Sequence, residues 1–126
     1  EKLPEWLQKI SKGIAANFGG DVKVQYRCIG PPVYNDLYLT NLIEKSGKLL
    51  LGDENVVQLT NPSLGAEDFA ELLKDVPGSM FRLGVANKEG CAPLHNGAFC
   101  PDERSLQIGV EVLTKTILSW IKQKNL

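Results

Sequence analysis

The fold prediction for this 126-residue chain starts from the run Met80–Val85 (MFRLGV) and from the loop after it, residues 86–100. The run is apolar except for Arg82, which is typical of a strand buried on both faces of a helix-covered sheet. The loop contains Ala92–Asn96 (APLHN) and with it the only histidine, His95. Loops at the ends of such strands collect binding and catalytic residues. His95 is therefore a candidate metal ligand, with a surface or hydrogen-bonding histidine as the alternative.

Two elements are predicted before a proline-rich linker. An amphipathic helix spans residues 3–18, because apolar residues recur at three- and four-residue spacing and Gly19-Gly20 follows. The stripe comprises Leu3, Trp6, Leu7, Ile10 and Ile14. Residues 21–28 alternate between apolar and polar, which predicts a half-exposed strand. Gly30-Pro31-Pro32 then disfavours a helix, so residues 29–34 are predicted to link two structural units.

Beyond the linker, helices and strands alternate. Asn35 or Asp36 caps a helix that ends at Gly52, although Ser46-Gly47 is expected to weaken its middle. The apolar positions of this helix are Leu39, Leu42, Ile43 and Leu50. A short strand, residues 56–59, is bounded by turn-forming residues on both sides.

A third helix is predicted over residues 65–75, and a fourth runs from its cap at Asp102 to about Lys122. The apolar face of the third helix consists of Phe69, Leu72, Leu73 and Val76, and that of the fourth of Leu106, Val110, Leu113, Ile117 and Ile121. The order from residue 36 onward is helix, strand, helix, strand, loop, helix. This alternation predicts an α/β fold with short strands covered by helices.

Composition and charge narrow the classes of function. The chain has 14 Lys and Arg against 15 Asp and Glu, so no net field attracts nucleic acid or an anionic membrane surface. Aromatic residues are too few for a platform that stacks bases. No apolar run is long enough to span a bilayer and no signal-peptide pattern is seen, so we expect a soluble, cytoplasmic protein.

The three cysteines leave several states open. Cys91 and Cys100 flank His95, but they lack metal-knuckle spacing and no second histidine completes a tetrahedral site. Reduced thiols in a cytosolic protein are the first expectation for these two residues and for Cys28. A Cys91–Cys100 disulfide in an oxidising compartment and an independent zinc site that uses Cys91, His95 and Cys100 are the alternatives.

Three further residues each have a structural and a functional interpretation. Glu67 and Asp68 either complement the dipole of the third helix or supply one carboxylate to a site. Adjacent helical residues point about 100° apart, so both are not expected in one site. Gly84 either permits a close backbone approach or marks a tight contact between helix and sheet.

Four motifs taken together resemble the C-terminal part of M20-family peptidases. They are Ser63–Phe69 (SLGAEDF), Val76-Pro77-Gly78, Phe81–Gly84 (FRLG) and Pro93–Asn96 (PLHN). Within that family the chain looks like the amidohydrolase branch that cleaves N-acyl amino acids and indole-acetyl amino acid conjugates. The resemblance covers nearly the whole chain.

The resemblance implies a fold in two parts. Residues 1–29 correspond to the last helix and strand of an inserted, ferredoxin-like lid domain that commonly dimerises. Residues 30–126 correspond to the C-terminal part of the catalytic domain, which is the closing half of a helix-covered, zinc-peptidase-like sheet. The fold class is therefore expected to be α/β.

The resemblance also implies site residues. His95 matches a ligand of a dinuclear Zn, Mn or Co centre, while Glu67 and Gly84 fall at the edge of the active site, near the substrate. The two metals of such a centre polarise an amide carbonyl and activate a bridging water. The other ligands and the general-base glutamate lie in an N-terminal half of the family's proteins that is built around a His-x-Cys-Gly-His-Asp type motif, and nothing in this sequence matches that motif. No residue is therefore assigned as catalytic, and the isolated chain is expected to be inactive.

The expected partners follow from the same comparison. They are an N-acyl amino acid or amino acid conjugate as substrate, and either a second copy of the chain or the missing N-terminal half. Exposed strand edges in the lid and the sheet favour such association. The alternative is a non-catalytic interaction module derived from such an enzyme.

Overall fold

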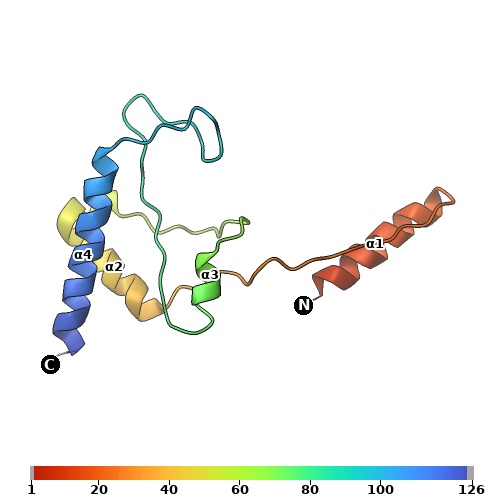
Figure 1. Ribbon diagram of the computed structural model, residues 1–126, viewed down its shortest axis with the longest axis horizontal. Helices are drawn as coiled ribbons and strands as arrows, with labels where there is room; N and C mark the ends of the chain where they lie inside the picture. Colours follow the sequence, from red (N-terminus) through yellow and green to blue (C-terminus); the bar gives the residue numbers. More distant parts are fainter. Residues whose placement is uncertain (1, 125–126) are drawn as a thin grey trace. The chain divides into compact units, whose positions relative to one another are not determined.

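The computed structural model describes residues 2–124, and the chain forms two compact units, Glu1–Pro31 and Pro32–Leu126. We call them the N-terminal and the C-terminal unit. The regular elements among the described residues are four α-helices and one 3-10 turn, η1 (Figure 1). No described helix is both long and apolar enough to cross a membrane. The assignment of residues 1–29 to a lid and of residues 30–126 to a catalytic domain stays a prediction.

The N-terminal unit contains helix α1, Leu3–Asn17, as predicted to within one residue. Gly19 closes it with φ 68°, and the Gly20 N–H donates to the carbonyl of Ala15 at 3.0 Å. The apolar stripe of α1 finds no cover within its own unit. Ile10 is 61% exposed, and no residue of α1 is buried.

The C-terminal unit begins with helix α2, Leu37–Leu51. Asp36 caps it, because its carboxylate oxygen accepts a hydrogen bond from the Leu39 N–H at 2.9 Å. Gly52 ends it with φ 88°, a left-handed conformation that glycine adopts without steric cost. Both predicted boundaries of this helix are confirmed. The 3-10 turn η1, Asp53–Asn55, follows directly.

Two more helices complete the regular structure. Helix α3, Phe69–Leu72, is a single turn and much shorter than the predicted span of residues 65–75. So short a helix depends on tertiary packing, and of its residues only Ala70 is buried. Helix α4, Arg104–Lys124, is close to its prediction. The Asp102 carboxylate accepts a hydrogen bond from the Arg104 N–H at 3.0 Å, which confirms that Asp102 caps this helix.

The strands predicted at residues 21–28, 56–59 and 80–85 are not formed among the described residues. The β-bridge that joins Asn87 to Gly90 is isolated and lies within a loop. A strand exists only where a neighbouring strand takes its backbone hydrogen bonds, and residues 2–124 supply no such neighbour. The α/β prediction is therefore not confirmed for this part of the chain, which is helical with non-helical connections.

Helix α2 packs against helix α4, and each helix buries only a few residues. Helix α2 buries Leu42, Ser46 and Gly47, and helix α4 buries Ser105 and Val112. Side chains of this size let helix backbones approach closely. Ser46-Gly47, expected to weaken the middle of α2, instead lies in its buried surface, and the helix continues through both residues.

Two glycines let the connecting segments reach the helices. A Cβ atom added at Gly47 would lie 3.2 Å from Val56 Cγ2, and one at Gly109 would lie 3.1 Å from Leu83 Cδ2. Val56 and Leu83 therefore rest almost directly on the backbone of α2 and α4. Two of the segments predicted as strands, residues 56–59 and 80–85, thus each place one side chain against a helix although no sheet is formed.

The predicted apolar face of α4 is exposed rather than buried. Its members Leu106, Val110, Leu113, Ile117 and Ile121 have exposed fractions of 70%, 64%, 49%, 56% and 41%. The buried residues of α4, Ser105 and Val112, lie on a different stripe of the helix. Helix α4 therefore buries both polar and apolar side chains within its own unit, and it exposes an apolar face to its surroundings. A helix that is apolar on most of its circumference is normally covered on all sides.

Asn35 ties the start of α2 to the segment that leads to Val85. Its amide nitrogen donates to the Met80 carbonyl at 2.8 Å, and its amide oxygen accepts from the Met80 N–H at 2.9 Å. Next to this pair, the Asp36 N–H donates to the carbonyl of Gly78 at 2.8 Å. The side chain of Asn35 thus takes the hydrogen bonds that a neighbouring strand would make.

We predict that Asn35→Ala frees the start of this segment. It removes two hydrogen bonds worth about 1 kcal/mol each, so the Met80 backbone amide should exchange its hydrogen roughly thirtyfold faster, as measured by NMR. Asn61→Ala is the control, because the Asn61 amide has no partner among the described residues. Unchanged protection of Met80 would show that the pair does not form in solution.

Candidate functional site

The single histidine lies in a closed loop at the start of α4. The Asp102 N–H donates to the carbonyl of Val85 at 2.8 Å, which joins the two ends of residues 86–101. We call this segment the His95 loop. Compact surface loops of this length with adjoining ends are frequently functional. One end of the loop thus leads into α4, and the other end follows directly on the segment that ends at Val85.

Two consecutive turns shape the middle of the His95 loop. The Asn96 N–H donates to the Pro93 carbonyl at 3.2 Å, and the Phe99 N–H donates to the Asn96 carbonyl at 2.9 Å. His95 occupies the third position of the first turn with φ 67°, the one residue other than glycine with positive φ in the chain as described. Turns with positive φ at this position usually carry Gly or Asn there.

The backbone of His95 is therefore held in a conformation that its own side chain disfavours. Such residues cost on the order of 1–3 kcal/mol and cluster at active sites and ligand clamps. The imidazole is exposed, so it is free to meet a ligand. Sequence reasoning identified His95 by its residue type and its loop, whereas the strained backbone is visible only in the structure.

Glu67 and Gly84, the other predicted site residues, are not joined to His95. No hydrogen bond or ion pair links any two of the three within residues 2–124. Glu67 is exposed just before α3, where its carboxylate accepts from the Phe69 N–H at 3.4 Å. A carboxylate at the start of α3 agrees with the structural interpretation, in which Glu67 complements the helix dipole.

Gly84 makes no tight contact. A Cβ atom added there would meet nothing within 4 Å, so neither the close backbone approach nor the tight helix contact is present at this position. The close approach occurs at Gly109 instead. Gly84 borders a recess of about 240 Å³ together with Asp102 and Arg104 at the base of the His95 loop.

The described residues do not form a metal centre by themselves. No three His, Cys, Asp or Glu side chains in residues 2–124 lie together in a way that could hold an ion. This includes Cys91, His95 and Cys100, so the independent zinc site is not supported. One exposed imidazole can supply one ligand, but two metal ions need ligands from outside this part of the chain.

Charge at the base of the loop is concentrated in one ion pair. Asp102 pairs with Arg104, whose Nε donates to the carboxylate oxygens at 2.9 and 3.1 Å. The side-chain hydrogen bond from Arg104, together with that from its backbone N–H, lowers the pKa of Asp102 from 3.8 to about 2. The same bond raises the pKa of the Arg104 guanidinium.

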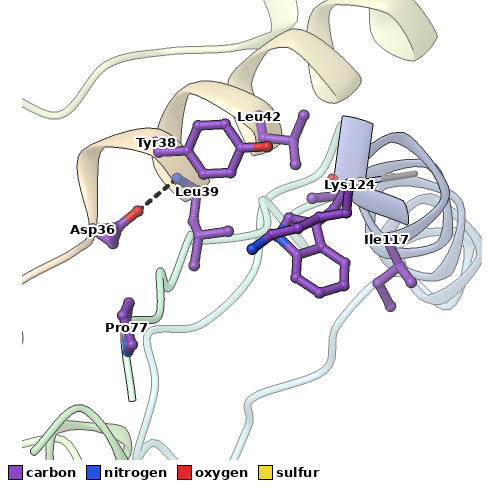
Figure 2. Close-up of a pocket in the computed structure, with 9 residues that line it drawn as sticks. Asp36, Tyr38, Leu39, Leu42, Pro77, Ile117 and Lys124 are labelled. Carbon is purple, nitrogen blue, oxygen red and sulfur yellow. Dashed lines mark hydrogen bonds between the residues drawn. The ribbon is translucent and has the colours of Figure 1, made fainter. Parts of the chain in front are cut away.

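An apolar groove of about 640 Å³ lies between α2 and α4 (Figure 2). It is lined by Asp36, Tyr38, Leu39, Leu42, Pro77, Thr116, Ile117, Trp120 and Lys124. Lys124 Nζ lies 5.4 Å from the Trp120 ring centroid, a cation–π contact. Sequence analysis missed Trp120 and Tyr38, which could have been found by extending the three- and four-residue spacing from Ile117 and Leu42.

Comparison with protein-family profiles matches residues 4–119 to peptidase family M20/M25/M40. The chain belongs to this family of peptidases and amidohydrolases, and its predicted resemblance is confirmed. No solved structure gives a significant match to the chain.

Curated relatives carry hydrolase names. A probable hydrolase of Synechocystis sp. is 36% identical over 90% of this chain and 29% of its own length. Thermostable carboxypeptidase 1 of Saccharolobus solfataricus is 33% identical over 86% of the chain and 27% of its own length. N-acetyldiaminopimelate deacetylase of Priestia megaterium is 31% identical over 90% of the chain and 29% of its own length. The chain thus spans less than a third of the length of these relatives.

We predict that position 95 tolerates Gly and Asn but not Val. A β-branched residue at positive φ costs about 1–2 kcal/mol, which should open the Pro93–Asn96 turn. The Asn96 amide should exchange its hydrogen about tenfold faster in His95→Val than in His95→Gly or His95→Asn. Equal exchange in all three variants would mean that position 95 does not hold a positive φ in solution.

We also predict an acid-sensitive base of the His95 loop. Because the pKa of Asp102 is lowered on folding, its stabilising effect is present above pH 3.8 and is lost as the pH falls through about 2. Titration of the Asp102 carboxyl carbon by NMR should show a midpoint near 2, and Arg104→Gln should raise it toward 3.8. Arg82→Gln is the control. A wild-type midpoint near 3.8 would exclude the ion pair.

Proposed function

We propose that this chain is the C-terminal portion of a metal-dependent amidohydrolase that cleaves N-acyl amino acids or amino acid conjugates. Membership of the M20 family supports the reaction class. Relatives named as carboxypeptidases and N-acetyldiaminopimelate deacetylases support an amide bond to an amino acid as the target. The three cysteines are free, which supports the cytoplasm as its location.

The observation that carries this proposal is the strained, exposed His95 in the matched PLHN motif. A histidine kept where Gly or Asn would fit better is explained if its imidazole is needed. We assign His95 as one ligand of a dinuclear Zn, Mn or Co centre whose other ligands lie outside this chain. Glu67 and Gly84 remain our proposed residues at the substrate edge of that site.

The exposed apolar faces support a larger assembly. The face of α4 that includes Leu106 and Val110 has no cover in its own unit, and α1 has none in the N-terminal unit. In the proposed enzyme, the rest of the catalytic domain covers α4, and the rest of the lid or a second copy covers α1. The segments predicted as strands pair with strands of the same missing part, so that the α/β sheet and the ferredoxin-like lid form only there.

The same exposed faces would also suit a second function, a non-catalytic interaction module that kept this tail and lost the metal site. In both cases the isolated chain is expected to be inactive, so the two proposals differ in what the chain can do when the remaining part is supplied.

A chimera distinguishes them. We predict that the chain, when it replaces the corresponding segment of thermostable carboxypeptidase 1, gives an enzyme that binds metal and hydrolyses N-acetyl amino acids. In that chimera His95→Asn should lower turnover at least about a hundredfold. Loss of a group that hydrogen-bonds to a metal ligand already costs roughly 10- to 100-fold, and loss of the ligand itself costs more. Metal per chain should fall with it.

Cys28→Ser is the control and should leave metal content and turnover unchanged. Thermal unfolding of each variant shows whether it folds. A folded chimera without metal and without turnover would reject the amidohydrolase proposal and favour the interaction module. A folded His95→Asn chimera with full metal content would reject the ligand assignment alone.

A further inference from the structure

The thiol of Cys91 reaches across the His95 loop to the backbone of Cys100. Cys91 Sγ donates to the backbone carbonyl oxygen of Cys100 at 3.2 Å. Cys100 is exposed and Cys91 is half-buried. The third thiol, Cys28, is exposed in the N-terminal unit, where it donates to the carbonyl of Gly30 at 3.5 Å. The first two cysteines therefore form a pair, and Cys28 provides an internal comparison.

The shape of the loop brings the pair together. The two turns that run from Pro93 to Phe99 fold the chain back between the cysteines, and the bond from Asp102 to Val85 holds the loop ends together. By standard bond lengths, the Sγ–O contact leaves the two Cα atoms at most about 8.5 Å apart. A disulfide needs about 4.4–6.8 Å. A small adjustment of an exposed loop covers the difference.

We propose that Cys91 and Cys100 are a reversible thiol–disulfide pair that closes a ring of residues around His95. The oxidant is a peroxide. The exposed Cys100 thiolate attacks one oxygen of hydrogen peroxide, the O–O bond breaks, hydroxide leaves and Cys100 becomes a sulfenic acid. The Cys91 thiolate then attacks the Cys100 sulfur, the S–O bond breaks, and the departing hydroxide takes a proton to form water. In sum, two thiols and one peroxide give one disulfide and two waters.

The consequence is confined to the loop. His95 lies in the middle of the ring that the disulfide closes, and the ring includes both turns. A cross-link between residues 91 and 100 reduces the number of open conformations of the loop. The mobility of the segment that carries His95 thus depends on the redox state. The pairing of the thiols does not rest on the proposed function, since it needs no metal and no substrate.

The experiment uses the whole purified chain, reduced and then treated with one equivalent of hydrogen peroxide. We expect the intact mass to fall by two hydrogen atoms, and peptide mapping to find Cys91 joined to Cys100 with Cys28 still free to alkylate. Dithiothreitol should restore the original mass. The Asn96 and Phe99 amides should exchange at least about tenfold more slowly in the oxidised chain.

Matched variants separate this pair from general thiol oxidation. Cys28→Ser should form the same disulfide, whereas Cys91→Ser and Cys100→Ser should each lose it. Mapping of the wild-type chain decides the question even if a variant does not fold. The proposal is overturned if peroxide only adds oxygen to single cysteines, or if the disulfides found involve Cys28 or join two chains. A disulfide that forms without slower exchange in the loop would overturn the effect on His95.

Discussion

The close packing of α2 against α4 is the contact on which the C-terminal unit depends. The buried residues of the two helices include Ser46, Gly47 and Ser105, and the glycines Gly47 and Gly109 admit Val56 and Leu83 to the helix surfaces. Close packing of this kind is sensitive to added volume. Helix α4 begins at the cap formed by Asp102, whose N–H also joins the ends of the loop that carries His95. The base of that loop is therefore attached to one of the two packed helices.

The second constraint is the apolar surface that remains uncovered. Only Leu42, Ala70 and Val112 are buried hydrophobic residues among those described, whereas most large apolar side chains along α1 and α4 are 39% to 70% exposed. Burial of apolar surface is the main favourable contribution to folding. The arrangement is understandable for a part of a larger domain, whose remaining strands and helices complete the core. This reasoning agrees with relatives that are more than three times as long.

The candidate site is likewise complete in some respects and incomplete in others. Its local features are complete, because hydrogen bonds within the chain form the turns, the loop base and the cap of α4. Its chemical features are not, because the imidazole belongs to no group of three possible metal ligands among residues 2–124. The strain at His95 is then a property of the chain itself, while any use of the imidazole depends on groups from outside it. Cys91 and Cys100 are the exception, since both partners of that chemistry lie in the loop.

The sequence by itself determined the helices α1, α2 and α4, the caps at Asp36 and Asp102, the ending at Gly52 and the family. These features depend on neighbours in sequence, such as a side-chain oxygen two or three residues from an N–H or a glycine after the last turn. The tertiary structure decided which segments form strands and which helix face is buried, and the hydrophobic period alone could not. The segments at 21–28, 56–59 and 80–85 have strand patterns but no strand, because a ladder needs a second backbone. The face of α4 that is buried was likewise set by what packs around it, and this depends on residues distant in sequence. The left-handed backbone of His95 belongs to the local turn from Pro93 to Asn96, which no hydrophobic period reveals.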